Sequence, residues 1–377
     1  MKIVQAYKSA TGEWNYHNEK QILKKPLVLV FGNRFMLEDH EVLEDLRKEF
    51  PYEDIVFGST AGEILDITVI ENAVTVYAIE FEKSSFAVKT GNIHTHNKDV
   101  AALGLALSNK MPKENLKHLF IVSEGSFVTG SSLIRGLESN FDENVPMTGG
   151  LCGDDSRFEK TLASYKDDPK EGEIVLIGLY GDTLEISYAS HGGWIGFGPE
   201  RIITKSEGNV LYEIDDQPAL ELYKKYLGDR VKRLAESTLL YPLNVIAPGK
   251  KDPVVRTILS LDTENQAMVF GDEIPQGSRV QLMMASADGI AQGALMAARQ
   301  AMQGRVNKPE LAIPVSCIGR KIVLTQRMEE EAELIREVIG DQASISGFYS
   351  YGEIAPFHGN NSCEFHNQTM TLTLISE

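Results

Sequence analysis

A glycine followed directly by an acidic residue occurs at three comparable places along the chain: Gly62-Glu63, Gly153-Asp154 and Gly352-Glu353. Each pair follows small residues at the predicted end of a β-strand. Small residues let the backbone approach a ligand closely, and free N–H groups there can bind an anionic group. A carboxylate directly behind them can take an ammonium or a hydroxyl group. The pattern suits a zwitterion such as an amino acid, although a tight turn whose acid caps nearby backbone would give the same pattern.

A second acid and two arginines extend this set of residues. Asp155 and Arg157 follow the second Gly-acid pair, and Arg320 follows a predicted strand, where α/β sheets commonly bind ligands. A guanidinium can hold a carboxylate through two parallel hydrogen bonds. Surface ion pairs in an acidic protein are the alternative interpretation of both arginines. We therefore expect a ligand-binding site among Gly62, Glu63, Asp154, Asp155, Arg157, Arg320 and Glu353.

Histidine and cysteine give weaker indications of chemistry. His191 and His366 stand beside apolar residues, and either could be an axial haem ligand, although a hydrogen-bonded structural histidine is the simpler interpretation. Cys317 follows a predicted strand and could be the nucleophile of a hydrolase, but no basic partner stands near it in the sequence. Phosphate-loop, dinucleotide-binding, zinc-protease and serine-hydrolase motifs are absent. The sequence therefore favours a binding protein over an enzyme and indicates no metal site.

The elements that must position these residues recur along the chain. Segments 84–186 and 278–375 show the same order of strand, helix, strand and small-residue loop, and residues 26–81 contain part of it. This order predicts an α/β fold of two related mixed-sheet domains, produced by internal duplication of strand-helix-strand-loop units, with a partial third copy at the N-terminus. Residues 173–181 and 184–190 are predicted as successive strands joined by a Gly-Asp turn.

The boundary between the domains is expected near residue 221. Residues 27–220 would form a ligand-sensing domain, and residues 221–377 would form the second domain. A helix that begins near Pro218 and ends before Gly228 lies across this boundary.

Composition limits the class of protein. The 377 residues carry 54 acidic and 37 basic side chains, so the formal net charge is −17. This charge disfavours binding to nucleic acid or to an anionic membrane. Three cysteines cannot form a disulfide framework, and neither an apolar leader nor an apolar run of 18 residues occurs. We therefore expect a cytoplasmic protein.

Longer segments carry a resemblance to a known family. The segments GGLCGDDSRFEKTLASYKD and GWIGFGPERIITKSEGNVLYEIDDQPALELYKKYLG resemble the FIST N-terminal domain. The segments PVSCIGRKIVLTQRMEEEAELIREV, ISGFYSYGEIAP and CEFHNQTMTLTLI resemble the FIST C-terminal domain. The resemblance runs from about residue 27 to the end, and its specificity lies in the combination of these segments.

The resemblance implies an intracellular sensory protein that binds a small ligand, with an amino acid as the expected example. It implies signalling to a partner protein such as a histidine kinase, a chemotaxis receptor or a cyclic-dinucleotide enzyme. Some members of the family resemble haem-based nitric oxide sensors that regulate a partner kinase, so haem is the alternative cofactor. The thiol-dependent hydrolase is the third alternative. The family offers no catalytic motif to transfer to these residues.

Overall fold

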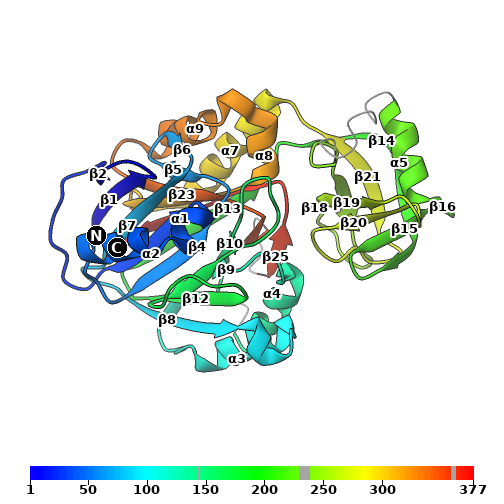
Figure 1. Ribbon diagram of the computed structural model, residues 1–377. Helices are drawn as coiled ribbons and strands as arrows, with labels where there is room; N and C mark the ends of the chain where they lie inside the picture. Colours follow the sequence, from blue (N-terminus) through cyan, green and yellow to red (C-terminus); the bar gives the residue numbers. More distant parts are fainter. Residues whose placement is uncertain (142–144, 229–237, 358–361) are drawn as a thin grey trace.

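The computed structural model describes residues 1–141, 145–228, 238–357 and 362–377, which form a large body and a smaller lobe (Figure 1). Three mixed β-sheets with helices on their outer faces make up the body. The two chain ends lie side by side on the body, where the amino group of Met1 forms ion pairs with Glu310 and Glu377. Among the described residues, no helix is long and apolar enough to cross a membrane.

Each six-stranded sheet of the body is built around a unit of four strands with one shared topology. The first strand lies beside the fourth, the fourth beside the second, and the second pairs in parallel with the third. The first sheet contains β1 (Lys2–Ser9), β3 (Leu27–Gly32), β4 (Ile55–Ser59) and β7 (Ala73–Glu80). The second contains β8 (Ser85–Asn92), β9 (Leu116–Ser123), β10 (Met147–Leu151) and β12 (Glu173–Tyr180). The third contains β13 (Glu185–His191), β22 (Leu311–Cys317), β23 (Ser344–Ser350) and β26 (Met370–Ser376).

Each of these units also gives a short strand to the sheet of another unit. β5 (Glu63–Leu65) leaves the first unit and pairs with β23 of the third, and β24 (Gly352–Pro356) leaves the third and pairs with β10 of the second. β11 (Ala163–Tyr165) leaves the second unit and pairs with β4 of the first. The exchange closes a ring of three units. The remaining edge strands are β2 (Asn15–Tyr16), β6 (Thr68–Ile70) and β25 (Cys363–His366).

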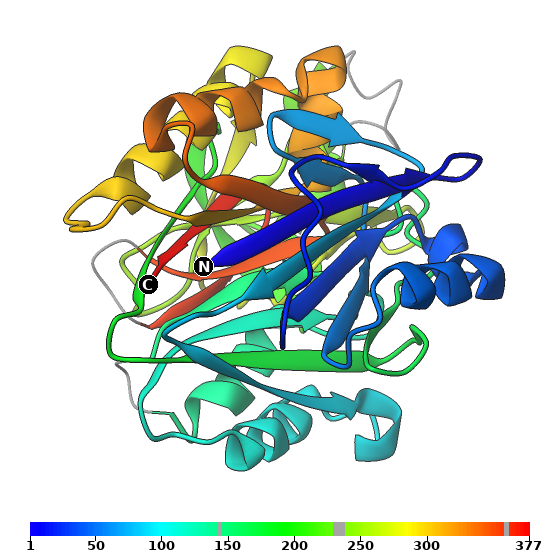
Figure 2. The same ribbon diagram turned by 90° about the vertical axis from the view of Figure 1, so that its left-hand side faces the viewer.

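Helices cover the outer face of every sheet (Figure 2). The inner faces share one apolar core. The first sheet carries α1 (Arg34–Glu38) and α2 (His40–Glu49). The second carries α3 (Val100–Lys110) and α4 (Gly130–Glu138), beside the short helix η1 (Ile93–His96). The third carries α7 (Ala287–Met302), α8 (Ile318–Leu324), η3 (Thr325–Arg327) and α9 (Glu330–Ile339). Alternate strand residues therefore point to helices or to the common core, as a sheet covered on both faces requires.

The smaller lobe interrupts the third unit. It lies between β13 and α7 and has its own apolar core. Its elements are β14 (Ile195–Glu207), β15 (Val210–Ile214), β16 (Gln217–Pro218), α5 (Ala219–Leu227), β17 (Leu243–Ile246), β18 (Val254–Arg256), β19 (Ile258–Asp262), β20 (Ala267–Phe270) and β21 (Arg279–Met284). In Figure 1 the lobe stands apart on the right.

The predicted α/β fold with mixed sheets and repeated units is confirmed. Two details differ from the expectation. The N-terminal copy is complete, because β1 supplies its first strand, so the body contains three units instead of two and a part. The strands predicted at 173–181 and 184–190 do not form a hairpin, because β12 pairs in the second sheet and β13 begins the third.

Candidate ligand-binding site

The three loops that carry Gly62-Glu63, Gly153-Asp154 and Gly352-Glu353 pass from one unit to another near one end of the body. A ring of three backbone hydrogen bonds joins them: Ala61 N–H to Tyr349 O (2.9 Å), Gly153 N–H to Ser59 O (2.8 Å) and Tyr351 N–H to Leu151 O (3.1 Å). Since each bond joins a different pair of units, these contacts define equivalent positions in the three loops.

Only two of the three predicted acids occupy equivalent positions. Glu63 lies opposite Phe348 at the start of β5, and Glu353 lies opposite Gly150 in β24. The corresponding residue of the second unit is Ala163, opposite Gly58. The prediction that Asp154 matches the two glutamates is therefore wrong. Asp154 lies in a loop inserted before β11, and nothing local in the sequence marks that insertion.

Glu63 and Glu353 are buried on the inner side of the sheets. The carboxylate of Glu353 accepts hydrogen bonds from Ser350 Oγ (2.6 Å), Thr369 Oγ1 (2.9 Å) and Thr369 N–H (3.1 Å). Glu63 accepts one from Thr60 Oγ1 (2.5 Å), and its Oε2 has no hydrogen-bond partner among the residues that the structure describes. Burial raises the pKa of Glu353 to about 7 and that of Glu63 to about 8. Neither side chain reaches solvent, so neither can contact a dissolved ligand directly.

Arg320 is also unavailable to a ligand, which corrects the expectation from its position after a strand. Its side chain is fully buried and forms an ion pair with Glu331. Its remaining donors bond to the backbone carbonyls of His191, Gly192 and Ile290. The guanidinium thus holds α8, α9 and the end of β13 together, and it has no free edge for a ligand carboxylate.

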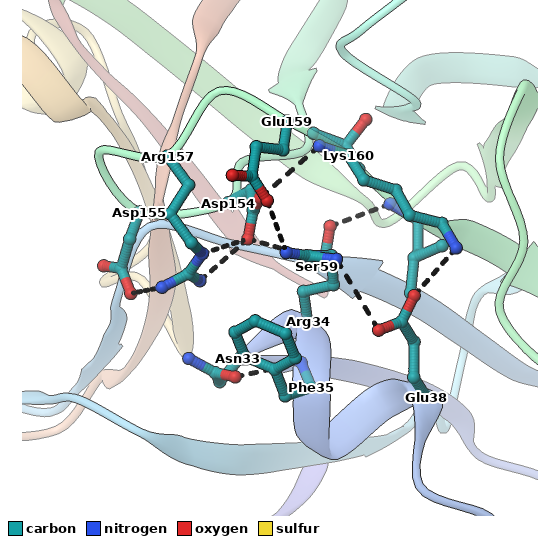
Figure 3. A network of polar contacts seen from close by, with 12 residues as sticks. Asn33, Arg34, Phe35, Glu38, Ser59, Asp154, Asp155, Arg157, Glu159 and Lys160 are labelled. Atoms are coloured by element: carbon teal, nitrogen blue, oxygen red, sulfur yellow. Dashed lines mark hydrogen bonds and ion pairs between the residues drawn. The ribbon is translucent and has the colours of Figure 1, made fainter.

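Asp154 is the centre of a charged network at the junction of the first and second units (Figure 3). Its Oδ1 accepts hydrogen bonds from Arg34 Nε (3.0 Å) and Arg157 Nε (2.8 Å). Asp154 is fully buried and Arg34 nearly so. Phe35 lies against both guanidinium groups, with its ring centroid 4.3 Å from Arg34 and 4.9 Å from Arg157. The network therefore fixes the inserted loop on α1.

Asp155 connects this network to Lys321, which was not among the candidate residues predicted from the sequence. Asp155 pairs with Arg157 at 3.4 Å on one side and with Lys321 at 3.7 Å on the other. Lys321 Nζ also donates to Ala61 O (2.7 Å) and pairs with Glu71 at 2.5 Å. Of the predicted residues, Gly62 and Asp155 lie at Lys321. A Cβ on Gly62 would stand 3.0 Å from Nζ, so a larger residue there would displace the ammonium.

A pocket of about 410 Å³ opens above Lys321. Its polar side includes Glu71, Asp155, Ser156 and Lys321, and its apolar side includes Ile318, Ile322 and Met328. The Lys321 side chain is only 10% exposed, whereas Glu71 is 49% and Asp155 31% exposed. The two carboxylates can therefore exchange partners with a ligand, while the ammonium is held in place by the backbone.

Comparison with known proteins places the chain in a family. The FIST N domain matches residues 26–217 and the FIST C domain matches residues 219–356. The chain belongs to the FIST family. FIST domains are associated with sensory signal transduction.

The relatives of this FIST protein give no more specific function. An uncharacterized protein of Methanocaldococcus jannaschii is 23% identical over 370 residues, which cover 85% of this chain and 69% of the relative. Uncharacterized proteins of Mycobacterium bovis and Mycobacterium tuberculosis are each 22% identical over 178 residues, 45% of this chain and 46% of theirs. A crystal structure of a cyanuric acid hydrolase from A. caulinodans aligns with 93% of this chain and 90% of its own, at 8% identity and a TM-score of 0.35, too low to carry an argument.

The two histidines proposed as haem ligands lie away from this pocket. His366 is buried, its Nε2 lies 3.0 Å from Ala355 O, and Phe357 packs edge-on against its ring. Burial lowers the pKa of His366 to about 4. Because the ring is buried and its Nε2 is engaged with a backbone carbonyl, His366 does not fit an axial ligand. His191 is half-buried, and its buried Nδ1 has no hydrogen-bond partner among the described residues.

The cysteine and metal alternatives can be judged from the same geometry. Cys317 is buried, and burial raises the pKa of its thiol well above the ordinary value, which disfavours the thiolate that a nucleophile requires. No group of three or more histidine, cysteine or acidic side chains within the described ranges could hold a metal ion.

The signal for Lys321 was present in the sequence but lies in a helical turn. Arg320 and Lys321 are neighbours in α8, directly after β22. Adjacent residues of a helix point about 100° apart, so one faces the core and the next can face the pocket. The expectation of a ligand-binding cation after this strand therefore identified the right helical turn, but the residue at the pocket is Lys321 and not Arg320.

Proposed function

We propose that this FIST protein senses a small molecule that carries an ammonium group, such as an amino acid, and that it binds this ligand in the Lys321 pocket. The proposal rests on one observation. The nearly buried ammonium group of Lys321 lies between the more exposed carboxylates of Glu71 and Asp155, beside an apolar wall. A zwitterion matches both signs of charge, and an apolar side chain matches the wall.

The bound ligand would exchange partners within the existing ion pairs. Its carboxylate would take the position of Glu71 at Lys321 Nζ, since Glu71 is the most exposed member of the cluster. Its ammonium group would lie between Glu71 and Asp155. Ile318, Ile322 and Met328 would receive its side chain. Charge-assisted hydrogen bonds of this kind are stronger than neutral ones, which supports binding in an open pocket.

Ligand binding in the Lys321 pocket would affect the contacts between the units, because all three units meet there. Lys321 belongs to the third unit, Glu71 to the first and Asp155 to the second. Asp155 also contacts Arg157, so a change at the ligand reaches the Asp154 network. A signal would leave through contact with a partner protein, for which a histidine kinase, a chemotaxis receptor and a cyclic-dinucleotide enzyme are the family's candidates. A cytoplasmic location stays a prediction from the sequence.

The test is calorimetric titration of the purified protein with the twenty amino acids and with simple amines. We expect at least one amino acid to bind, and Lys321→Met to weaken its binding at least about tenfold, the loss of one charge-assisted hydrogen bond. Lys205→Met is the matched control, because Lys205 is 62% exposed and lies in the lobe. Equal affinity in the Lys321→Met and wild-type proteins would remove the pocket from the proposal.

A further inference from the structure

The position of Asp155 in the Lys321 pocket depends on a short segment with an unfavourable backbone. Asp155 and Phe158 have positive φ angles of 49° and 54°, in the left-handed region that residues with side chains rarely adopt. A bulky aromatic residue such as Phe158 is especially uncommon there. Residues keep such angles only where surrounding contacts hold them. The contacts of the segment 155–158 therefore determine where the Asp155 carboxylate lies.

One hydroxyl group, that of Tyr351, contacts both of these residues. Tyr351 Oη donates a hydrogen bond to Asp155 O (2.9 Å) and accepts one from Phe158 N–H (3.1 Å). The ring of Tyr351 also stacks on the ring of Phe158, with the centroids 4.5 Å apart and the planes at 20°. Tyr351 lies between β23 and β24 in the third unit, whereas the segment 155–158 belongs to the second unit. The segment is thus held from outside its own unit.

The repeated architecture does not itself require a tyrosine at this place. Ala61, Gly153 and Tyr351 donate the three equivalent backbone hydrogen bonds of the loops. An alanine and a glycine make these bonds as well as a tyrosine does, because the donor is the backbone N–H. Of the three residues, only Tyr351 has a side chain long enough to reach across the junction to Asp155. The tyrosine side chain therefore serves the segment 155–158 and not the shared topology.

The carboxylate that this segment presents lies between two cations. Asp155 pairs with Arg157 at 3.4 Å (Figure 3) and with Lys321 at 3.7 Å, and 31% of its side chain is exposed. Both contacts are longer than a good hydrogen bond, which measures about 2.7–3.2 Å, so the carboxylate keeps acceptor capacity for a ligand. A carboxylate that is already fixed loses little freedom when an ammonium group binds to it. Fixing Asp155 should therefore strengthen binding of an ammonium group.

We propose that Tyr351 is a positioning residue, which fixes Asp155 so that the pocket selects an amino acid with an aliphatic side chain over the same acid without its amino group. This inference rests on the proposed function and makes its ligand more specific. The apolar side of the pocket, with Ile318, Ile322 and Met328, suits an aliphatic side chain. Leucine is therefore the probe. Its matched analogue is 4-methylpentanoate, which has the same carbon skeleton and carboxylate but no amino group.

Calorimetric titration with the two probes is the first test. We expect the wild-type protein to bind leucine at least about tenfold more tightly than 4-methylpentanoate, the effect of one charge-assisted hydrogen bond. Tyr351→Phe keeps the ring that stacks on Phe158 and removes only the hydroxyl. It should bind leucine at least about fivefold more weakly than wild type, the effect of one neutral hydrogen bond, and should bind 4-methylpentanoate with unchanged affinity.

A control variant and a double-mutant cycle separate positioning from general support of the fold. Tyr180→Phe also loses a bond from a tyrosine hydroxyl to a backbone carbonyl, that of Pro112 (2.8 Å), at the opposite end of the second sheet, and should bind leucine like wild type. If Tyr351 acts through Asp155, the double variant of Tyr351→Phe and Asp155→Asn should bind leucine within about twofold of Asp155→Asn alone, because residues of one network are not additive. A tyrosine that only supported the fold would lower the affinity by the same factor in both backgrounds.

Hydrogen exchange without a ligand tests the contact itself. We expect the Phe158 amide to exchange at least about fivefold faster in Tyr351→Phe than in wild type, with an unchanged circular dichroism spectrum, because its acceptor is lost. Unchanged exchange at Phe158, equal affinity of wild type for the two probes, equal losses for both probes in Tyr351→Phe, or additive effects in the cycle would each overturn the role of Tyr351. Absence of leucine binding to wild type would overturn the aliphatic amino acid as the ligand, whereas the proposed function itself fails only if no amino acid or amine binds.

Discussion

The guanidinium of Arg320 and the carboxylate of Glu331 form an ion pair that is completely withdrawn from solvent between α8 and α9. Glu331 also accepts hydrogen bonds from Ser316 Oγ (3.1 Å) and Tyr349 OH (3.1 Å). The pair therefore joins two helices to the third sheet. Removing one partner leaves the other charged, buried and unpaired.

Arg320→Met should accordingly lower the free energy of unfolding by about 3–5 kcal/mol, the range for breaking a buried pair. Urea unfolding monitored by circular dichroism measures this loss. Arg279→Met is the control, since Arg279 and Glu200 are about half exposed and such pairs contribute about 0–1 kcal/mol. A variant that unfolds like wild type would show that the pair is not a structural element.

Glu63→Gln should change the pH dependence of stability. Burial raises the pKa of Glu63 to about 8 from its ordinary 4.5. The folded protein then keeps a proton that the unfolded chain loses, so this contribution to stability is complete below about pH 4.5 and is lost as the pH rises through about 8. The variant mimics the protonated acid. At about pH 9 its free energy of unfolding should therefore be larger than that of the wild type by at least about 1 kcal/mol, which corresponds to roughly one pKa unit.

Urea unfolding of both proteins between about pH 5 and pH 9 measures the difference, since the window spans the shift. Glu159→Gln, at a side chain that is 66% exposed, should follow the wild-type curve. Parallel curves for Glu63→Gln and wild type would contradict a protonated Glu63 at neutral pH.

Although Asp154 and Asp155 are neighbours, Asp154→Asn should mainly lower stability, whereas Asp155→Asn should mainly weaken ligand binding. Asp154 is fully buried between Arg34 and Arg157, so its loss should cost about 3 kcal/mol or more. Asp155 is 31% exposed at the pocket, so its loss should cost about 1 kcal/mol or less and should weaken amino-acid binding. Thermal unfolding and calorimetric titration of both variants test the contrast, and equal effects on stability would refute it.

Asp272→Asn should loosen the contact between lobe and body. Asp272 is buried in the lobe, and its Oδ2 accepts hydrogen bonds from Ser131 N–H (3.1 Å) and Ser131 Oγ (2.5 Å) in the first turn of α4. Thr129, the residue before this helix, makes no side-chain cap, so Asp272 caps α4 from another part of the fold. Loss of a cap costs about 0.5–2 kcal/mol.

Hydrogen exchange should therefore be faster at the start of α4 in Asp272→Asn, while α3 stays unchanged. Glu273→Gln is the comparison, since Glu273 pairs with the exposed Arg135 at 2.9 Å on the surface. Equal protection of α4 in Asp272→Asn and wild type would contradict capping from the lobe.

Haem binding through His366 should not occur. The ring is buried, and its Nε2 lies 3.0 Å from the backbone carbonyl of Ala355. Titration with hemin should give no Soret band that His366→Ala abolishes. A stoichiometric Soret band lost in His191→Ala would instead support the haem alternative, with His191 as the iron ligand.

Local patterns in the sequence are enough to predict the elements of the fold and their repetition. Apolar strands alternating with amphipathic helices, and loops with Gly62-Glu63 and Gly352-Glu353 at their ends, were sufficient to predict a mixed α/β fold of repeated units. These features depend on neighbouring residues, because strand and helix periodicity act over a few positions.

Packing between distant segments determines which of the candidate residues reach solvent. Exchange of β5, β11 and β24 between units buries Glu63 and Glu353 and puts Ala163 where a third acid was expected. Packing of α9 on α8 buries Arg320 and leaves Lys321 beside the pocket. Burial of a side chain depends on segments that are distant in the sequence, and no local pattern records which segment will cover it.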